Sequence, residues 1–229
     1  MERPPLNSES STDAAIEHFL SLGQPKAGDG LLDMDPIVHA GGVTPWQFLS
    51  TLAERREIAF HGTGDPNIES FEPREPIDFA PFGHQKAVFA TTDPIWAMFY
   101  AVVDRDRYRL TLNNGCIVLM DAEGRPGLPH YYFSITGGAL RQRPWRTGYV
   151  YFLPAETFVA QPAERYAGRL ARIPQLASPV AVTPFARLRI TWASTRKQSW
   201  PLRRGRTETG AARRCRSSAP VLVSVPGDA

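Results

Sequence analysis

The spacing of apolar residues changes along the chain, from helical near the amino terminus to strand-like in the second half. Apolar positions three and four apart predict a short helix over residues 14–22, capped by Asp13 and stopped by Gly23. Residues 24–43 are rich in Gly, Pro and Asp and predict a loop. We therefore expect one short helix followed by a long connection.

A second helix has a strong start signal in the sequence Thr-Pro-Trp-Gln at residues 44–47. Thr44 is the predicted N-cap, Pro45 occupies the first helical position, and Gln47 completes a capping box. We expect this helix to run to about Arg56, with its apolar residues facing the core.

Short strands and one strongly apolar helix follow. Strands are predicted at residues 58–60 and 87–91, and Asp93 with Pro94 predicts the start of a deeply buried helix. Later apolar runs have the length and composition of strands, at residues 116–120, 131–135, 149–153, 180–183 and 188–190. Because strands outnumber helices there and do not alternate with them, the pattern predicts an α+β fold rather than a doubly wound sheet.

Charge is distributed unevenly along the 229 residues, whose formal net charge is +3. Residues 1–186 contain 16 basic and 21 acidic residues, whereas residues 187–229 contain 10 basic and 2 acidic residues. The basic character belongs to the C-terminal region, so it does not indicate a nucleic-acid-binding domain. We predict an N-terminal arm with one short helix at 1–43, an α+β domain at 44–192 and a basic, disordered tail at 193–229.

Several classes of protein do not fit the composition. The longest apolar runs fall short of the roughly 18–20 residues that cross a bilayer, and the amino terminus lacks the pattern of a secretory signal. The two cysteines, Cys116 and Cys215, are too few for a disulfide scaffold and suit a reducing cytoplasm. We also find no His, Cys, Asp and Glu set with metal-ligand spacing, so we expect a cytoplasmic protein with no bound metal and no membrane partner.

The most informative stretch for function is residues 58–103. One strand ends in His61, Gly62 and Thr63, and a second strand leads directly into the helix that carries Tyr100. This order places an imidazole and a hydroxyl beside a glycine whose backbone can approach a ligand closely. Hydrogen-bonding groups beside an aromatic ring suit a flat aromatic amide attached to a ribose.

The same stretch resembles the first half of the ADP-ribosyltransferase fold, in its poly(ADP-ribose) polymerase and diphtheria-toxin-like branch. The similarity lies in His-Gly-Thr at 61–63, Val-Phe-Ala-Thr at 88–91 and the eleven-residue step from Phe89 to Tyr100. It covers residues 57–104, and residues 105–190 by strand order. The resemblance implies a split antiparallel or mixed sheet core, with an N-terminal helical region, and NAD as the substrate.

The resemblance also implies a role for each matching residue. It implies that His61 hydrogen-bonds the nicotinamide ribose, that Gly62 meets the carboxamide through its backbone, and that Thr63 lies by the adenosine side. Phe89 corresponds to a position where the branch usually has Tyr, and it keeps the ring wall without the hydroxyl. Tyr100 is implied to stack on the nicotinamide.

The sequence departs from the family at its third motif, a Glu at the start of a late strand that supports the oxocarbenium-like transition state. The corresponding strand here is predicted at 149–153, and no carboxylate precedes it. Thr147 is the nearest polar residue, so it becomes the third candidate catalytic residue beside His61 and Tyr100. Glu156 follows the strand and is expected at its opposite end.

Three functions remain open from the sequence. The first is transfer of ADP-ribose from NAD to a protein or nucleic acid with release of nicotinamide. The second is a non-catalytic binding or interaction module on the same fold, and the third is an NAD-dependent RNA 2′-phosphotransferase, for which Arg141, Arg143 and Arg146 are the candidate phosphate ligands. Each site residue also has a purely structural interpretation, with His61 as a turn residue and Tyr100 as part of the core.

Overall fold

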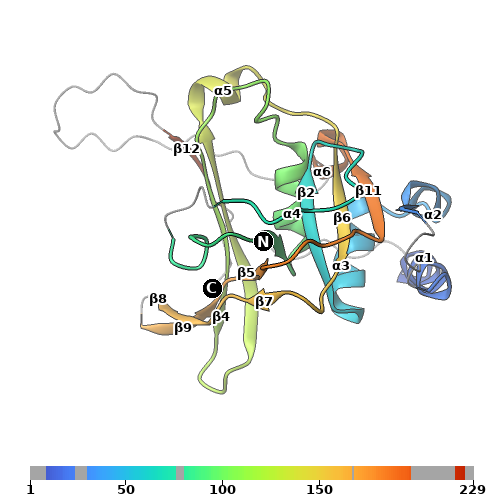
Figure 1. Ribbon diagram of the computed structural model, residues 1–229, viewed down its shortest axis with the longest axis horizontal. Coiled ribbons are helices and arrows are strands. Elements are labelled where there is room, and N and C mark those ends of the chain that lie inside the picture. The colour runs from blue at the N-terminus through green and yellow to red at the C-terminus, as the bar shows by residue number, and fades with distance from the viewer. Residues whose placement is uncertain (1–8, 24–29, 76–79, 167, 197–219, 225–229) are drawn as a thin grey trace.

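The computed structural model describes residues 9–23, 30–75, 80–166, 168–196 and 220–224 of the chain. Two β-sheets and a set of short helices make up these residues (Figure 1). The helices are α1 (Glu9–Ser21), α2 (Asp35–Ala40), α3 (Pro45–Arg55), α4 (Pro94–Val102), α5 (Gly137–Arg141) and α6 (Trp192–Arg196). The mixed α+β class predicted from the apolar pattern is therefore confirmed.

The larger sheet has seven strands in the order β1-β11-β6-β2-β3-β10-β7. Neighbouring strands are antiparallel, except for β1 and β11, which are parallel. In that order the strands span Leu32–Asp33, Ala186–Ile190, Gly148–Pro154, Ile58–Thr63, Val88–Thr91, Gln175–Ser178 and Val159–Ala160. The strand with the His-Gly-Thr sequence, β2, thus lies at the centre of this sheet.

The smaller sheet has the order β12-β5-β4-β9-β8, with antiparallel pairs throughout. Its strands span, in that order, Pro220–Ser224, Pro126–Thr136, Leu112–Met120, Arg169–Arg172 and Glu164–Tyr166. The long β4–β5 hairpin stands on one side of the molecule in Figure 1, and β2, β6 and β11 stand on the other.

Helix α4 is the element that both sheets share. Its residues Ala97, Met98, Ala101 and Val102 belong to the core that α1, α3 and the larger sheet build. Its other face, with Trp96, Phe99 and Val103, packs with Cys116, Phe133 and Ile135 of the smaller sheet. A helix buried on both faces needs apolar residues nearly all round, which is the pattern that the sequence has between residues 94 and 103.

The capping box at the start of α3 is confirmed. The backbone N–H of Gln47 donates to Thr44 Oγ1 at 3.3 Å, and the backbone N–H of Thr44 donates to Gln47 Oε1 at 3.1 Å. The helix ends at Arg55, one residue before the predicted position.

We expect the change Thr44→Ala to lower the free energy of unfolding by about 1 kcal/mol, because an N-terminal N–H of α3 loses its acceptor. Urea unfolding monitored by circular dichroism measures this change. Thr44→Ser keeps the hydroxyl and is expected to behave like the wild type. An equal loss in both variants would contradict the capping role of this side chain.

The N-terminal region differs from its prediction. Helix α1 starts at Glu9, so Asp13 lies within it and forms an ion pair with Arg55 instead of capping the helix. Residues 24–43 are not loop throughout, because they contain β1 and α2. Strand β1 exists through its pairing with β11, far away in the chain, which local composition cannot reveal.

The C-terminal half contains a second correction. Residues 180–183 do not form a strand of either sheet, and Val182 makes an isolated bridge with Phe71. The neighbouring strand is β10, at Gln175–Ser178, which fills the place beside β3. Of the tail predicted from residue 193, the structure describes the end of α6 and the backbone of β12; the rest lies outside the described residues.

Candidate functional site

The centre of the larger sheet is split beside the His-Gly-Thr sequence. Strand β2 pairs with β6 along its full length, but with β3 at the single position where Phe60 stands opposite Thr91. Beyond Phe60 the backbone ladder between β2 and β3 ends, and we call the unpaired stretch beside residues 61–63 the opening. A backbone edge outside the ladder has donors and acceptors available for another partner.

His61 spans this opening with its side chain. Its Nδ1 lies 2.7 Å from the carbonyl oxygen of Phe89 on β3. Because a carbonyl oxygen can only accept, Nδ1 carries the proton, and in the neutral ring Nε2 keeps a lone pair. Burial lowers the pKa of His61 to about 4, against a weaker opposing effect of the Phe89 hydrogen bond. At neutral pH the imidazole is therefore uncharged, with Nε2 as a hydrogen-bond acceptor.

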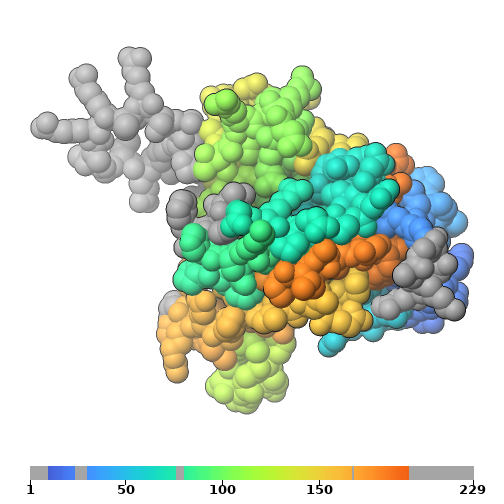
Figure 2. Space-filling model, viewed as in Figure 1, coloured from blue at the N-terminus to red at the C-terminus, as the bar shows by residue number. Residues whose placement is uncertain are grey.

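Two arginines act on the imidazole of His61. After burial, Arg105 and Arg74 also lower the pKa of His61, and within the described part of the chain no carboxylate is among the groups that shift it. The ring of Phe71 lies against the imidazole with the ring centroids 4.6 Å apart. Phe71 and Arg74 belong to the segment between β2 and β3, which crosses the face of the molecule in teal in Figure 2. Phe71 forms a bridge with Val182, and the segment that contains Val182 is the orange one beside it.

Gly62 is required by the packing of α4. A Cβ at this position would lie 1.8 Å from the carbonyl oxygen of Ala97. Gly148 on β6 is in the same situation, since its Cβ would lie 1.9 Å from the carbonyl oxygen of Ala101. The sequence suggested that a ligand approaches the backbone of Gly62 closely. On one side of Gly62 this space is occupied by α4.

A buried polar group fixes the start of α4. Asp93 caps the helix, accepting from the N–H of Trp96 at 2.8 Å and from the hydroxyl of Tyr131 at 2.6 Å. Burial raises the pKa of Asp93, while these hydrogen bonds and one with Cys116 act in the opposite direction. The cap predicted from Asp93 and Pro94 is confirmed, and its bond to Tyr131 links α4 to β5.

Tyr100 lies on the side of α4 that turns toward the smaller sheet. Its hydroxyl donates to Asn114 Oδ1 on β4 at 3.0 Å. The guanidinium of Arg105 lies over its ring, 5.3 Å from the centroid. Arg105 therefore lies near Tyr100 and also acts on the titration of His61. His61 and Tyr100 lie on opposite sides of β2, because His61 belongs to the face that α4 does not cover.

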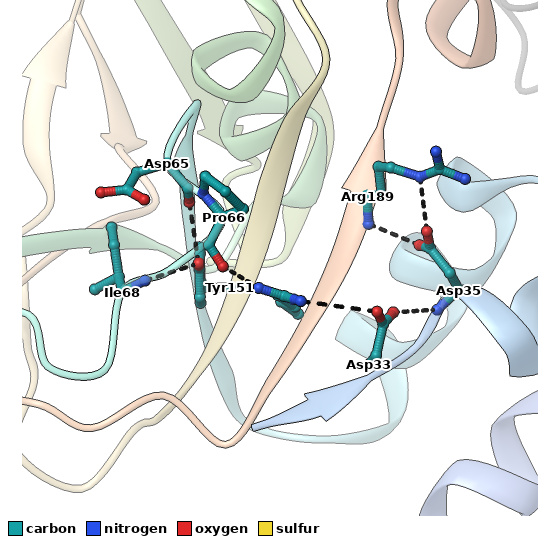
Figure 3. A network of polar contacts seen from close by, with 8 residues as sticks. Asp33, Asp35, Asp65, Pro66, Ile68, Tyr151 and Arg189 are labelled. Carbon is teal, nitrogen blue, oxygen red and sulfur yellow. Dashed lines mark hydrogen bonds and ion pairs between the residues drawn. The ribbon is translucent and has the colours of Figure 1, made fainter. Parts of the chain in front are cut away.

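The turn that follows Thr63 is held from the neighbouring strand. The hydroxyl of Tyr151 donates to the carbonyl oxygen of Asp65 at 3.0 Å and accepts from the N–H of Ile68 at 3.1 Å, as Figure 3 shows. Arg187 donates to the carbonyl oxygen of Pro66 in the same turn. The end of β2 is therefore fixed on the side away from the opening.

The remaining predicted residues are less closely grouped. Phe89 is half-buried and points away from the face that holds Val88 and Ala90, so it shares the side of the sheet on which α4 lies. The hydroxyl of Thr63 accepts from the N–H of Asp65 at 3.3 Å. Phe89 can thus form a wall of the opening, whereas Thr63 is engaged in the turn.

Thr147 lies too far from His61 to contact the same ligand atom. Tyr151 stands opposite His61, and Thr147 precedes it by four residues, which is about 13 Å along an extended chain. Thr147 is exposed, and Glu156 follows the opposite end of β6 as expected.

The three arginines predicted to bind RNA phosphates, Arg141, Arg143 and Arg146, do not form one accessible cluster. Arg146 is largely buried and forms ion pairs with Asp104 and Asp106, and its guanidinium packs against Gly64. Arg141 and Arg143 are exposed. These ion pairs neutralise one of the three arginines of the predicted basic cluster.

Sequence reasoning missed the residues that hold the site together. Asn114, Arg105 and Phe71 contact the candidate residues from three different segments. Arg105 stands in a run of alternating charges typical of a solvated surface, and Asn114 stands in a strand with no local signal. Their roles depend on long-range contacts.

Comparisons with protein-family models, with curated proteins and with solved structures find no match. Among the described residues, no group of three or more His, Cys, Asp or Glu side chains is arranged to hold a metal ion. The described helices also lack the length and apolar character needed to cross a membrane.

Proposed function

We propose that this chain is an NAD-binding protein of the ADP-ribosyltransferase type, which transfers ADP-ribose to a protein or nucleic acid. The observation that carries the proposal is the opening between β2 and β3, with the His-Gly-Thr sequence on its edge and a neutral imidazole anchored across it. Nε2 of His61 has the acceptor character that a ribose hydroxyl needs.

The environment of Tyr100 supports the same ligand. The electron-rich face of a tyrosine attracts cations, and here a planar cation, the guanidinium of Arg105, already lies over it. The nicotinamide ring of NAD is also a planar cation. A nicotinamide that stacks on this face displaces Arg105, whose side chain is exposed and long enough to move.

In the proposed reaction, the bond between the nicotinamide nitrogen and C1′ of the ribose breaks, and nicotinamide leaves with the bonding electrons. The acceptor then forms a bond to C1′ and loses a proton to solvent. In this proposal His61 orients the ribose and Tyr100 orients the leaving group.

One observation favours a second candidate function, a module that binds NAD without turnover. A carboxylate that stabilises the developing positive charge is a large catalytic contribution, and the residue before β6 is Thr147 instead of a carboxylate. The exposed Thr147 cannot replace a negative charge. Binding of NAD is common to both candidates, and transfer separates them.

Calorimetric titration of the full chain with NAD and with nicotinamide tests the proposal. We expect NAD to bind, and His61→Ala and Tyr100→Ala each to weaken binding at least about tenfold, because each removes a ligand contact. His130→Ala and Tyr166→Ala are matched controls on exposed strand positions and are expected to bind normally. Failure of the wild type to bind NAD or nicotinamide at millimolar concentration would remove the proposal.

Labelled NAD, incubated with and without RNA, then separates the functions. Label on protein or nucleic acid indicates ADP-ribose transfer. Binding without any loss of NAD indicates the module, and consumption of NAD only with 2′-phosphorylated RNA indicates the phosphotransferase.

A further inference from the structure

The side chain of Asn114 on β4 joins two aromatic residues of α4. Its Oδ1 lies 2.6 Å from Trp96 Nε1 and 3.0 Å from the hydroxyl oxygen of Tyr100. Trp96 and Tyr100 are four residues apart and therefore lie on the same side of the helix. One amide oxygen on the smaller sheet thus contacts both rings.

The chemistry of the partners determines how this amide is oriented. An indole N–H can only donate, so the atom of Asn114 that faces Trp96 is the oxygen. The hydroxyl of Tyr100 contacts the same oxygen and therefore donates to it. The orientation of the amide follows from its partners and fixes the direction of the Tyr100 O–H.

We propose that Asn114 is a positioning residue that holds the ring of Tyr100 in the plane used for stacking on nicotinamide. The inference rests on the proposed function. A tyrosine ring turns about two side-chain bonds, and Tyr100 is half-buried, so core packing covers the ring only in part. A hydrogen bond at the hydroxyl holds the far end of the side chain and so restricts rotation about the Cα–Cβ bond. The hydroxyl oxygen lies on the Cβ–Cγ axis, so the ring plane is set through the O–H bond, which prefers to lie in the plane of the ring and here points at Asn114 Oδ1.

Fixing the ring before binding favours the ligand in two ways. The complex loses less conformational entropy when the ring is already ordered. Donation of the O–H to an acceptor also leaves the ring richer in electrons, which strengthens its attraction for a cationic ring. Trp96 contributes through the amide, because its indole N–H holds the oxygen of Asn114 in place.

The experiment compares two substitutions of nearly equal size. Asn114→Leu removes the acceptor, whereas Asn114→Asp keeps an oxygen for both donors. We expect Asn114→Leu to weaken NAD binding about tenfold, because the hydroxyl of Tyr100 loses the acceptor that positions its ring. We expect Asn114→Asp to bind NAD at least as well as the wild type. Asn113→Leu, on the exposed neighbouring position, is the matched control and is expected to bind normally.

The indole N–H resonance of Trp96, assigned with Trp96→Phe, supplies a readout that does not need NAD. We expect this resonance to shift in Asn114→Leu and to stay close to its wild-type position in Asn114→Asp. It also reports whether each variant is folded.

The outcomes separate this inference from the proposed function. If the wild type binds no NAD, the proposed function fails, while the indole resonance still tests the contact. If Asn114→Leu shifts the resonance but binds NAD as the wild type does, the positioning role is overturned. If Asn114→Asp loses binding as much as Asn114→Leu does, the amide N–H₂ contacts the ligand directly, and the role inferred here is wrong.

Discussion

Replacing Gly62 with alanine is expected to lower the free energy of unfolding by about 3 kcal/mol or more, the range of severe overpacking. The new Cβ would lie 1.8 Å from the carbonyl oxygen of Ala97 and 2.9 Å from the backbone nitrogen of Ala101. Both atoms belong to the backbone of α4, so no flexible side chain can move aside. The helix must shift away from β2, which opens the core on both of its faces.

Urea unfolding at neutral pH measures this effect. Gly115→Ala is the matched control, because a Cβ at this glycine on β4 meets nothing within 4 Å and its φ is not in the left-handed region. We expect this control to be neutral or slightly stabilising. An unchanged unfolding midpoint for Gly62→Ala would show that α4 does not lie directly on β2.

Acidification is expected to destabilise the protein through His61. The pKa of His61 is about 4 in the folded chain and 6.5 in an unfolded chain, so between these values the unfolded chain binds more protons. The contribution of His61 to stability is complete above pH 6.5 and is lost as the pH falls toward 4. A difference of about 2.5 pH units corresponds to about 3 kcal/mol.

Unfolding of His61→Gln and of the wild type between pH 4 and pH 7 measures this contribution. We expect the variant to lose less stability than the wild type over this range, because glutamine does not titrate. Asp93 has a raised pKa, so its contribution to stability falls as the pH rises, opposite to that of His61. Because the variant and the wild type both contain Asp93, this contribution cancels when the two are compared at the same pH. His130→Gln, an exposed control, is expected to follow the wild type. Parallel curves for His61→Gln and the wild type would contradict the neutral, anchored imidazole.

Local signals in the sequence predicted the elements that depend on local physics. The capping box of Thr44 and the Asp93 cap are formed by residues three positions apart, so their partners are visible in the sequence. The dense apolar character of residues 94–103 predicted a deeply buried helix, and α4 is buried between two sheets. The strand before the His-Gly-Thr sequence was also predicted, although β2 continues through Thr63.

Elements that depend on distant partners were missed. Strand β1 is held by β11, more than 150 residues later, and β10 lies beside β3 rather than at the predicted 180–183. Thr147 was chosen from its place before a strand, but the register of β6 against β2 separates it from His61. Sequence spacing gives no information about such registers.

By itself, the sequence determined where α3 and α4 begin, and that His61 and Gly62 lie on a strand and Tyr100 on a buried helix. These features follow from contacts within a few residues and from burial patterns. The split between β2 and β3, the protonated nitrogen of His61 and the contact of Tyr100 with Asn114 were decided by the tertiary structure. They depend on atoms from separate elements meeting within hydrogen-bond distance: β2 and β3 bring His61 to Phe89, and the packing of α4 against the smaller sheet brings Tyr100 to Asn114.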